Sequence, residues 1–409
     1  MLPAGALVIL NANDIPPTNA DGSLIPVPGS DLFYLSGVAQ EESILVLFPD
    51  AHDDKMREML FIRETNETIT VWEGYKLTKE QAVKVSGVPR IHWLSEWPMM
   101  LRKLMCEATT VFLNSNEHPR ADVTVQTKEA RFVRDIQQAF PLHRYERLAR
   151  VMHELRPVKS SHEVKLLQKA CDITRDGFLR LLGMVKPGVN ECEVEAELAH
   201  EFIRQRGRYA YNPIIAAGAN SCVLHYNDNN RECRKGDVLL LDVAACYANY
   251  NADMTRTIPV SGKFSKRQKE VYNAVLRVLR KSIAGLTPGK LPRDWQKESE
   301  LMTQEELLKL GLITTKDIKK QDPDKPALKK YFMHGLGHPL GLDVHDVATI
   351  GAAFAPGWVM TVEPGIYIPE EGFGVRLEND VLITETGVED LMGHIPIEIE
   401  EIESLMSRK

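Results

Sequence analysis

The sequence lacks the features that mark several large classes of protein. Its 409 residues have a formal net charge of −7, with charges of both signs mixed along the chain and no basic patch of the kind that nucleic acid requires. No apolar run approaches the roughly 18 to 20 residues of a membrane-spanning helix. The N-terminal segment MLPAGALVIL lacks a basic leader and a long apolar core. We therefore expect a cytoplasmic protein that acts on small molecules or peptides, without nucleic acid or membrane partners.

Cysteine is also scarce. The six cysteines include no CxxC pair and are too few for a disulfide scaffold, which predicts free and mostly buried thiols. Cys222, Cys233 and Cys246 lie near the polar segments described below. No partner base stands at a recognisable position, so a catalytic thiol is not expected.

The length of the chain favours two domains. Residues 1–155 alternate short β-rich runs with helical patterns, which predicts an α/β domain. The expected strands are 6–10, 44–48, 59–63 and 110–114, and the expected helices are 94–107 and 126–138. This part has no Gly-rich phosphate loop. Its aromatic pair, Trp72 and Tyr75, could pack in the core or line a pocket, and core packing is the default expectation.

A domain boundary is expected near residue 156. Ser160 and Glu163 form a capping box just after it and predict the start of a long helix. The second domain would then cover residues 156–409.

An internal repeat runs through this second domain. Helices expected to begin at Ser160 and Ser265 each end at a Pro-Gly pair, and second helical patterns follow at 191–206 and 295–310. The repeat is weak in identity but consistent in order. Two such copies packed face to face would share a pseudo-twofold axis.

The polar segments repeat as well. His225 and His345 are 120 residues apart, and the apolar strands that end at Asp242 and Glu363 are 121 apart. The second acids of the two copies are Asp253 and Glu378. The repeat would therefore bring four carboxylates and several histidines to one axis.

The stretch from His334 to His345, HGLGHPLGLDVH, holds three histidines among glycines. The glycines favour a loop, and histidines so close together suggest metal binding or proton transfer. The alternative is a glycine-rich turn with incidental histidines.

Four buried carboxylates at one place need compensating charge. Two like charges ~4 Å apart repel by on the order of 4 kcal/mol at an effective dielectric near 20. Arg256 and Arg376 could form salt bridges, but two divalent cations cancel the charge better. Oxygen ligands with one imidazole favour Mn²⁺, Co²⁺, Fe²⁺ or Zn²⁺, which would acidify a bridging water and polarise a carbonyl. A metal-free network of ion pairs would leave the histidines unexplained.

Four segments resemble, in order and spacing, the signature segments of the pita-bread metallopeptidases of family M24. They are LDVAACYANYNADMTRT, HGLGHPLGLDVHD, TVEPGIY and GVRLENDVLIT. The family includes methionine aminopeptidase, prolidase, aminopeptidase P and the non-metal creatinases. The resemblance implies an α+β pita-bread domain with a pseudo-twofold repeat and two metal ions. The family's ligand types fall on Asp242, Asp253, His338, Glu363 and Glu378. Because none is missing, a creatinase or a catalytically dead relative is not expected.

The N-terminal domain indicates which members of the family the chain resembles most. Methionine aminopeptidases lack such a domain, whereas aminopeptidase P and prolidase have it. The segment PGSDLFYLSG at 28–37 resembles the aminopeptidase P group, and TVWEG at 70–74 resembles a segment whose tryptophan reaches a neighbouring subunit's active site. The resemblance implies a creatinase-type α/β domain with substrate and oligomer contacts, a dimer or tetramer, and Trp72 in a partner's substrate pocket.

The resemblance also implies roles for the site residues in an Xaa-Pro aminopeptidase. Asp242 would chelate one metal, His338 and Glu363 the other, and two acids would bridge: Asp253 and Glu378. Mn²⁺ is the expected metal. Glu363 would transfer the proton of a metal-bridging hydroxide to the leaving proline.

Other side chains would bind the substrate. His225 and His345 would stabilise the oxyanion, and His334 would shape the prolyl pocket and take part in catalysis. Arg376 would support the bridging acids or bind a substrate carboxylate, with Asp380 as a further supporting residue. Prolidase remains an alternative because GVRLEN occurs in both groups, as do a non-catalytic peptide-binding relative and an esterase or organophosphate hydrolase.

Overall fold

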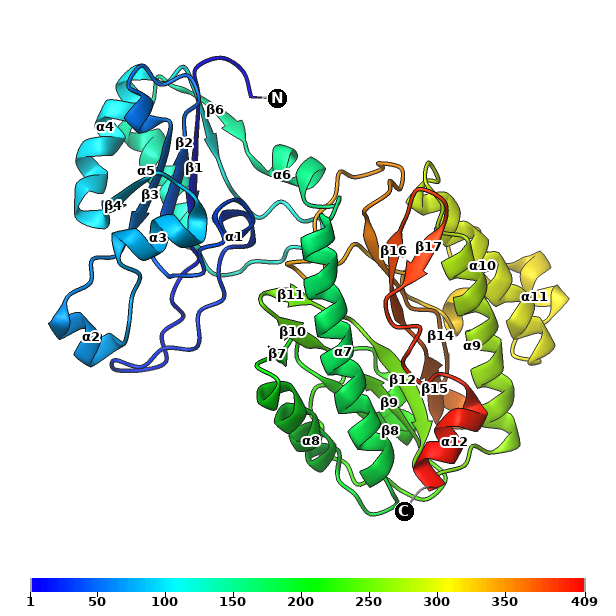
Figure 1. Ribbon diagram of the computed structural model, residues 1–409. Helices are drawn as coiled ribbons and strands as arrows, with labels where there is room; N and C mark the ends of the chain where they lie inside the picture. The colour runs from blue at the N-terminus through cyan, green and yellow to red at the C-terminus, as the bar shows by residue number, and fades with distance from the viewer. Residues whose placement is uncertain (1, 408–409) are drawn as a thin grey trace. The chain divides into compact units, whose positions relative to one another are not determined.

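The computed structural model describes residues 2–407, which fall into two compact units, 1–155 and 156–409 (Figure 1). Within the described residues, no helix is long and apolar enough to cross a membrane. Each unit has its own sheet and helices, so each is considered by itself.

The first unit is built on a six-stranded mixed sheet. In spatial order its strands are β4 (Arg90–Trp93), β3 (Glu58–Ile62), β2 (Ile44–Leu47), β1 (Ala6–Asn11), β5 (Thr110–Leu113) and β6 (Arg144–Arg147). Strand β1 runs parallel to β5 and antiparallel to β2. The central strand is buried on both faces: Val8 and Leu10 pack into one core cluster, and Leu7 and Ile9 into another.

Helices cover both faces of this sheet. They are α1 (Ser30–Ser36), α2 (Glu67–Glu73), α3 (Lys79–Ser86), α4 (Trp97–Glu107), α5 (Lys128–Ala139) and α6 (Ala149–Leu155), with single 3₁₀ turns at Asp54–Met56 and Leu94–Glu96. Residues of α1, α3 and α6 join the cluster around Val8, while residues of α4 and α5 join the cluster around Leu7. A sheet covered on both faces explains why its strands read as continuous apolar runs.

The four predicted strands and two predicted helices of this unit are confirmed to within a few residues. The edge strands β4 and β6 were missed because each has only four residues, RIHW and RYER, with no continuous apolar run. The default expectation that Trp72 and Tyr75 pack in the core is wrong. Their exposed fractions are 81% and 95%, because the short helix α2 and the residues after it project from the sheet.

Helices of the second unit follow the predicted repeat. They are α7 (Ser161–Met184), α8 (Glu191–Arg204), α9 (Lys266–Ala284), α10 (Pro292–Lys309), α11 (Thr315–Lys320) and α12 (Ile399–Ser407), with 3₁₀ turns η3 (Gly218–Cys222), Ala327–Lys330 and Pro369–Glu371. The helices α7 and α9 both begin at a capping box, with N-cap residues Ser160 and Ser265. In Figure 1 they flank the strands of this unit.

Strands of the second unit form four small sheets. They are β7 (Arg208–Tyr209) with β10 (Ala245–Tyr247) and β11 (Tyr250–Asn251); β8 (Ile214–Ala217) with β9 (Val238–Asp242) and β12 (Thr255–Pro259); β13 (Val359–Val362) with β16 (Asn379–Ile383) and β17 (Val388–Asp390); and the hairpin of β14 (Gly365–Ile368) and β15 (Phe373–Arg376). The strands β9 and β13 are each preceded by a glycine with positive φ, Gly236 at 92° and Gly357 at 90°. The predicted repeat thus extends to the backbone of the turns.

Hydrogen bonds join the two halves of the repeat. The Thr257 hydroxyl donates to the Arg376 carbonyl at 3.0 Å, and the Glu378 amide donates to the Thr255 carbonyl at 3.0 Å. The two sheets that carry the predicted acids therefore meet at their edges.

Candidate active site

Two buried strands carry acidic residues at their ends. Strand β9 is a run of four apolar residues that ends at Asp242, and β12 places Thr255 opposite it in the antiparallel ladder. Strand β13 is equally buried, and Glu363 is the residue after its end. The apolar strands therefore draw these carboxylates out of water.

His338 is tied to β13 by its backbone. Its amide donates to the Thr361 hydroxyl at 3.0 Å, and the Thr361 amide donates to the His338 carbonyl at 2.9 Å. A Cβ on Gly337 would lie 2.0 Å from the Thr361 carbonyl oxygen, so this approach requires glycine. The imidazole Nδ1 lies 3.0 Å from the Pro339 carbonyl, which can only accept. Nδ1 therefore carries the proton, and Nε2 presents a lone pair.

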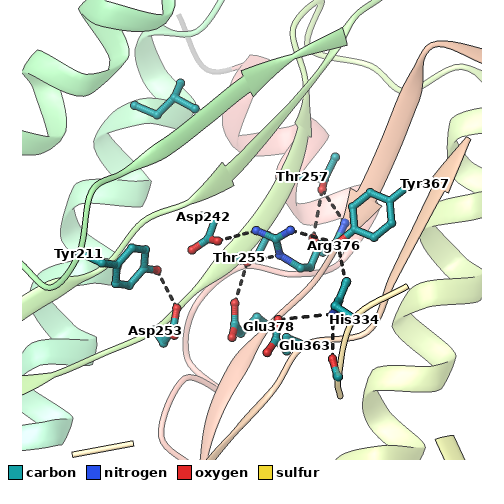
Figure 2. A network of polar contacts seen from close by, with 12 residues as sticks. Tyr211, Asp242, Asp253, Thr255, Thr257, His334, Glu363, Tyr367, Arg376 and Glu378 are labelled. Atoms are coloured by element: carbon teal, nitrogen blue, oxygen red, sulfur yellow. Dashed lines mark hydrogen bonds and ion pairs between the residues drawn. The ribbon is translucent and has the colours of Figure 1, made fainter. Parts of the chain in front are cut away.

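The structure brings the five predicted ligand residues together. His338 Nε2 lies 3.5 Å from Asp253 Oδ2 and 4.0 Å from Glu363 Oε1. Asp253, His338 and Glu378 offer ligand atoms that all lie within 4.8 Å of one another. Figure 2 shows the four carboxylates of this cluster, which come from both halves of the repeat.

The cluster has the properties of a site for divalent cations. Oδ1 of Asp242 is buried and has no hydrogen-bond partner among the described residues. Burial raises the pKa of Asp242, raises the pKa of Glu363 to about 7 and, with the charge of Asp253, raises the pKa of Glu378 well above its usual range. Burial is the main cause of these shifts, because it disfavours the charged carboxylates, and bound cations would favour the charged forms. Carboxylate oxygens with one imidazole nitrogen fit two divalent ions.

Arg376 links the cluster to a chain of polar groups (Figure 2). Its guanidinium pairs with Asp242, and it donates from Nε to the Thr255 hydroxyl at 3.0 Å and from Nη1 to the Tyr367 hydroxyl at 3.0 Å. The Thr255 hydroxyl donates in turn to Glu378 Oε2 at 2.7 Å. Arg376 thus pairs directly with Asp242, which is not one of the expected bridging acids, and reaches the expected bridging acid Glu378 through the Thr255 hydroxyl.

Arg256 does not provide the expected salt bridge. Its guanidinium is fully buried and donates to backbone carbonyls, at 2.7 Å to Glu378, 3.0 Å to Thr255 and 3.0 Å to Pro396. The side chain points away from the carboxylates because its neighbour Thr255 occupies the face toward Asp242. Arg256 therefore fixes the backbone behind the site.

The other predicted histidines lie at different depths. His334 Nε2 is 2.7 Å from the Tyr367 hydroxyl, and its Nδ1 is 3.7 Å from Glu363 Oε2. The His345 ring packs edge to face on His338, with 4.2 Å between ring centroids. His225 is exposed in the loop after η3, and among residues 2–407 no hydrogen bond or ring contact joins it to the cluster. Trp72 belongs to the other unit.

Several site residues were missed from the sequence. The Tyr211 hydroxyl donates to Asp253 at 2.7 Å, and Tyr367 connects His334 with Arg376. Tyr211 stands alone before β8, so no pattern marked it. Tyr367 follows Glu363 by four residues, so the sequence placed it near the site but did not indicate its role. Asp380, named only as a supporting candidate, is buried and accepts from the Asp253 amide at 3.0 Å.

Two family descriptions match the chain. Residues 165–385 match Metallopeptidase family M24, and residues 1–112 match the Aminopeptidase P, N-terminal domain. The chain is 36% identical to an Xaa-Pro aminopeptidase of Escherichia coli over 99% of its own length and 94% of the relative's. It is 31% identical to human Xaa-Pro aminopeptidase 3, over 97% of this chain and 78% of the relative.

Solved structures agree with these matches. A zinc-substituted aminopeptidase P of E. coli in complex with product superposes with a TM-score of 0.86 at 34% identity, covering 99% of this chain and 94% of that one. Proline aminopeptidase P II from Yersinia pestis gives a TM-score of 0.87 at 31% identity, covering 100% and 96%. The similarity therefore spans both units.

Proposed function

Because the chain belongs to metallopeptidase family M24, we propose that it hydrolyses the bond between an N-terminal residue and a following proline, as an Xaa-Pro aminopeptidase. The observation that carries this proposal is the group of Asp253, His338 and Glu378, with Glu363 and Asp242 beside it, in a chain that matches an Xaa-Pro aminopeptidase over 99% of its length. The chain is a metal-dependent hydrolase of this family.

We assign the metal ligands to Asp242, Asp253, His338, Glu363 and Glu378. Asp242 would help to hold one ion and His338 with Glu363 the other, and Asp253 and Glu378 would provide the further carboxylate oxygens. Oxygen-rich coordination with one imidazole supports Mn²⁺, with Co²⁺, Zn²⁺ and Fe²⁺ as alternatives. When bound, the ions supply an acidified water and polarise the scissile carbonyl.

The protein's own groups then handle protons and substrate. Glu363 is the candidate to accept the proton of the attacking water and to deliver it to the proline nitrogen. His225 and His345 donate hydrogen bonds to the developing oxyanion. His334 shapes the prolyl pocket, supported by its bond to Tyr367, and Arg376 holds Asp242 or takes a substrate carboxylate.

We further propose a homo-oligomer, dimer or tetramer, in which Trp72 lines the substrate pocket of a neighbouring copy. The high exposure of Trp72 and Tyr75 supports this role, since large exposed aromatics commonly mark binding surfaces. The N-terminal unit would thus provide substrate and oligomer contacts. A cytoplasmic location is supported by the six free cysteines, of which three are buried.

Peptide length tests the proposal. The metal-reconstituted enzyme should cleave Xaa-Pro-Xaa tripeptides to release the first residue, as followed by chromatography. Cleavage of Xaa-Pro dipeptides alone would identify a prolidase instead. Binding of both peptides without cleavage by the metal-loaded protein would identify a non-catalytic peptide-binding relative.

A further inference from the structure

A buried ion cluster lies behind the histidine loop. The Asp346 side chain is 1% exposed, and it accepts from Lys159 Nζ at 3.0 Å and from the Arg156 guanidinium. The side chains of Lys159 and Arg156 are themselves only 1% and 3% exposed. Charges buried this deeply need close partners, because an unpaired one is costly. The three groups therefore hold one another in fixed positions.

Arg156 contacts the chain on both sides of His345. Its Nη2 donates to Asp346 Oδ1 and also to Asp343 Oδ2, the latter at 2.6 Å. These two acids stand one residue after and two residues before the histidine. A single guanidinium thus spans the short segment that carries the imidazole. The backbone adds a further bond, from the Asp346 amide to the Pro339 carbonyl at 2.9 Å.

The His345 side chain lies beside the ligand histidine of the cluster. The residue is exposed, and its ring contact is with the edge or face of His338. The backbone sets the position and direction of the bond from which the imidazole projects, so a shift of this segment moves the ring. That backbone is packed closely here, since a Cβ on Gly341 would lie 2.2 Å from Asp346 Oδ2.

We propose that Arg156, with Lys159 and Asp346, positions His345 for the reaction. None of the three is among the five assigned metal ligands, and they act through the direction of the imidazole. The effect on catalysis rests on the proposed function, whereas the effect on the orientation of His345 does not. A cluster with only a structural role would change stability without changing the contribution of His345.

The test uses Arg156→Lys in the full-length, metal-loaded enzyme. Lysine keeps the charge but lacks the fork that reaches two carboxylates. We expect kcat on an Xaa-Pro-Xaa tripeptide to fall ~10-fold, with metal content unchanged and KM within about twofold, since loss of orientation acts in the transition state. In a His345→Ala background, Arg156→Lys should lower kcat no further. A loss in the double variant equal to the product of the single losses would overturn the proposal.

A control variant separates position from charge. Glu306 is also buried and is held by an arginine and a lysine, Arg277 and Lys309, away from the site. Arg277→Lys should leave kcat unchanged. Should Arg156→Lys fail to fold, Asp343→Ala provides the same test, because the Asp343 side chain is 45% exposed and its loss removes one half of the span.

A second measurement needs no activity. In protein labelled with ¹³C at histidine Cε1, the His345 signal is identified by its absence in His345→Ala. It should shift or broaden in Arg156→Lys and Asp343→Ala but not in Arg277→Lys. An unchanged signal in both of the first two variants would refute positioning. Absence of tripeptide cleavage by the parent enzyme would refute the proposed function while leaving this measurement to decide the positioning.

Discussion

The two halves of the second unit share one backbone plan and anchor their histidine loops in different ways. In the first half, Glu191 is buried and accepts from three neutral donors of the described residues, the Ala217 amide at 2.7 Å, the Tyr226 hydroxyl at 2.8 Å and the Arg231 amide at 2.9 Å. Tyr226 is the neighbour of His225. In the second half, the neighbour of His345 is itself the buried carboxylate, and two cations hold it.

The halves also differ in what they give to the metal site. Each half supplies two acids at equivalent places. In the second half, the loop that carries His338 is also hydrogen-bonded to strand β13 at Thr361. The strands of the two halves therefore place their carboxylates symmetrically, whereas the loops of the two halves differ. A single imidazole among four acids is the result, which makes the coordination rich in oxygen.

The largest expected effect is confined to the second half. Replacing His338 by alanine removes the only imidazole assigned to the metals, so turnover should fall below detection and the bound metal, measured by plasma mass spectrometry, should fall with it. His225→Ala serves as the counterpart and should keep its metal. Full activity in His338→Ala would end the ligand assignment.

The next effect should be equal in the two halves. His225→Ala and His345→Ala should each lower kcat by more than ~10-fold with metal content kept, since one oxyanion donor is worth about 2.7 to 4 kcal/mol in other hydrolases. Steady-state kinetics on one tripeptide provides the comparison. If His225→Ala has normal kinetics, the exposed loop of the first half takes no part in catalysis.

A smaller effect concerns the neutral anchor of the first half. In Glu191→Gln the new amide must face either the Ala217 amide or the group of Tyr226 and Arg231 donors, so a buried donor loses its acceptor. Urea unfolding should show a loss of about 1 to 3 kcal/mol. Glu195→Gln, on the same helix, keeps an acceptor for its single partner Asn229 and should cost far less. Equal losses in both would show that the burial of Glu191 is unimportant.

Sequence patterns predicted the parts of this unit that depend on local chemistry. The capping box at Ser160, the helix start at Ser265 and the apolar runs before Asp242 and Glu363 each depend on a few neighbouring residues, and they were confirmed, as was the order of the repeat. Together they define the strand ends at which the acids lie.

Contacts between segments far apart in the chain were harder to predict from the sequence. The Arg256 side chain was expected among the acids, but strand alternation turns it toward backbone carbonyls from a segment more than 100 residues away. Tyr211 and Tyr367 enter the site through packing that no periodicity reveals. The exposure of Trp72 likewise depends on how α2 leaves its sheet.

The smallest effect compares the second helices of the two halves. Glu201 on α8 pairs with Arg204, and Glu306 on α10 with Lys309, three residues on in each case; Glu306 also receives Arg277 from α9. The hydrogen bond from Arg204 lowers the pKa of Glu201, and the bonds from Arg277 and Lys309 lower the pKa of Glu306 against the opposing effect of its burial. A lowered pKa stabilises the fold above the unfolded-state value near ~4.3 and loses that contribution as pH falls through the folded-state value.

Glu201→Gln and Glu306→Gln should therefore each cost about 1 kcal/mol or less at pH 7, because the cations are largely exposed. The deficit should shrink as the parent carboxylate takes up its proton below ~4.3. Urea unfolding at pH 7 and at acidic pH gives both values. Glu306→Gln should show the larger change, since two cations from two helices hold that acid. A deficit independent of pH would mean that the cost comes from packing, and the matching ion pairs of the two halves would then have no electrostatic role in stability.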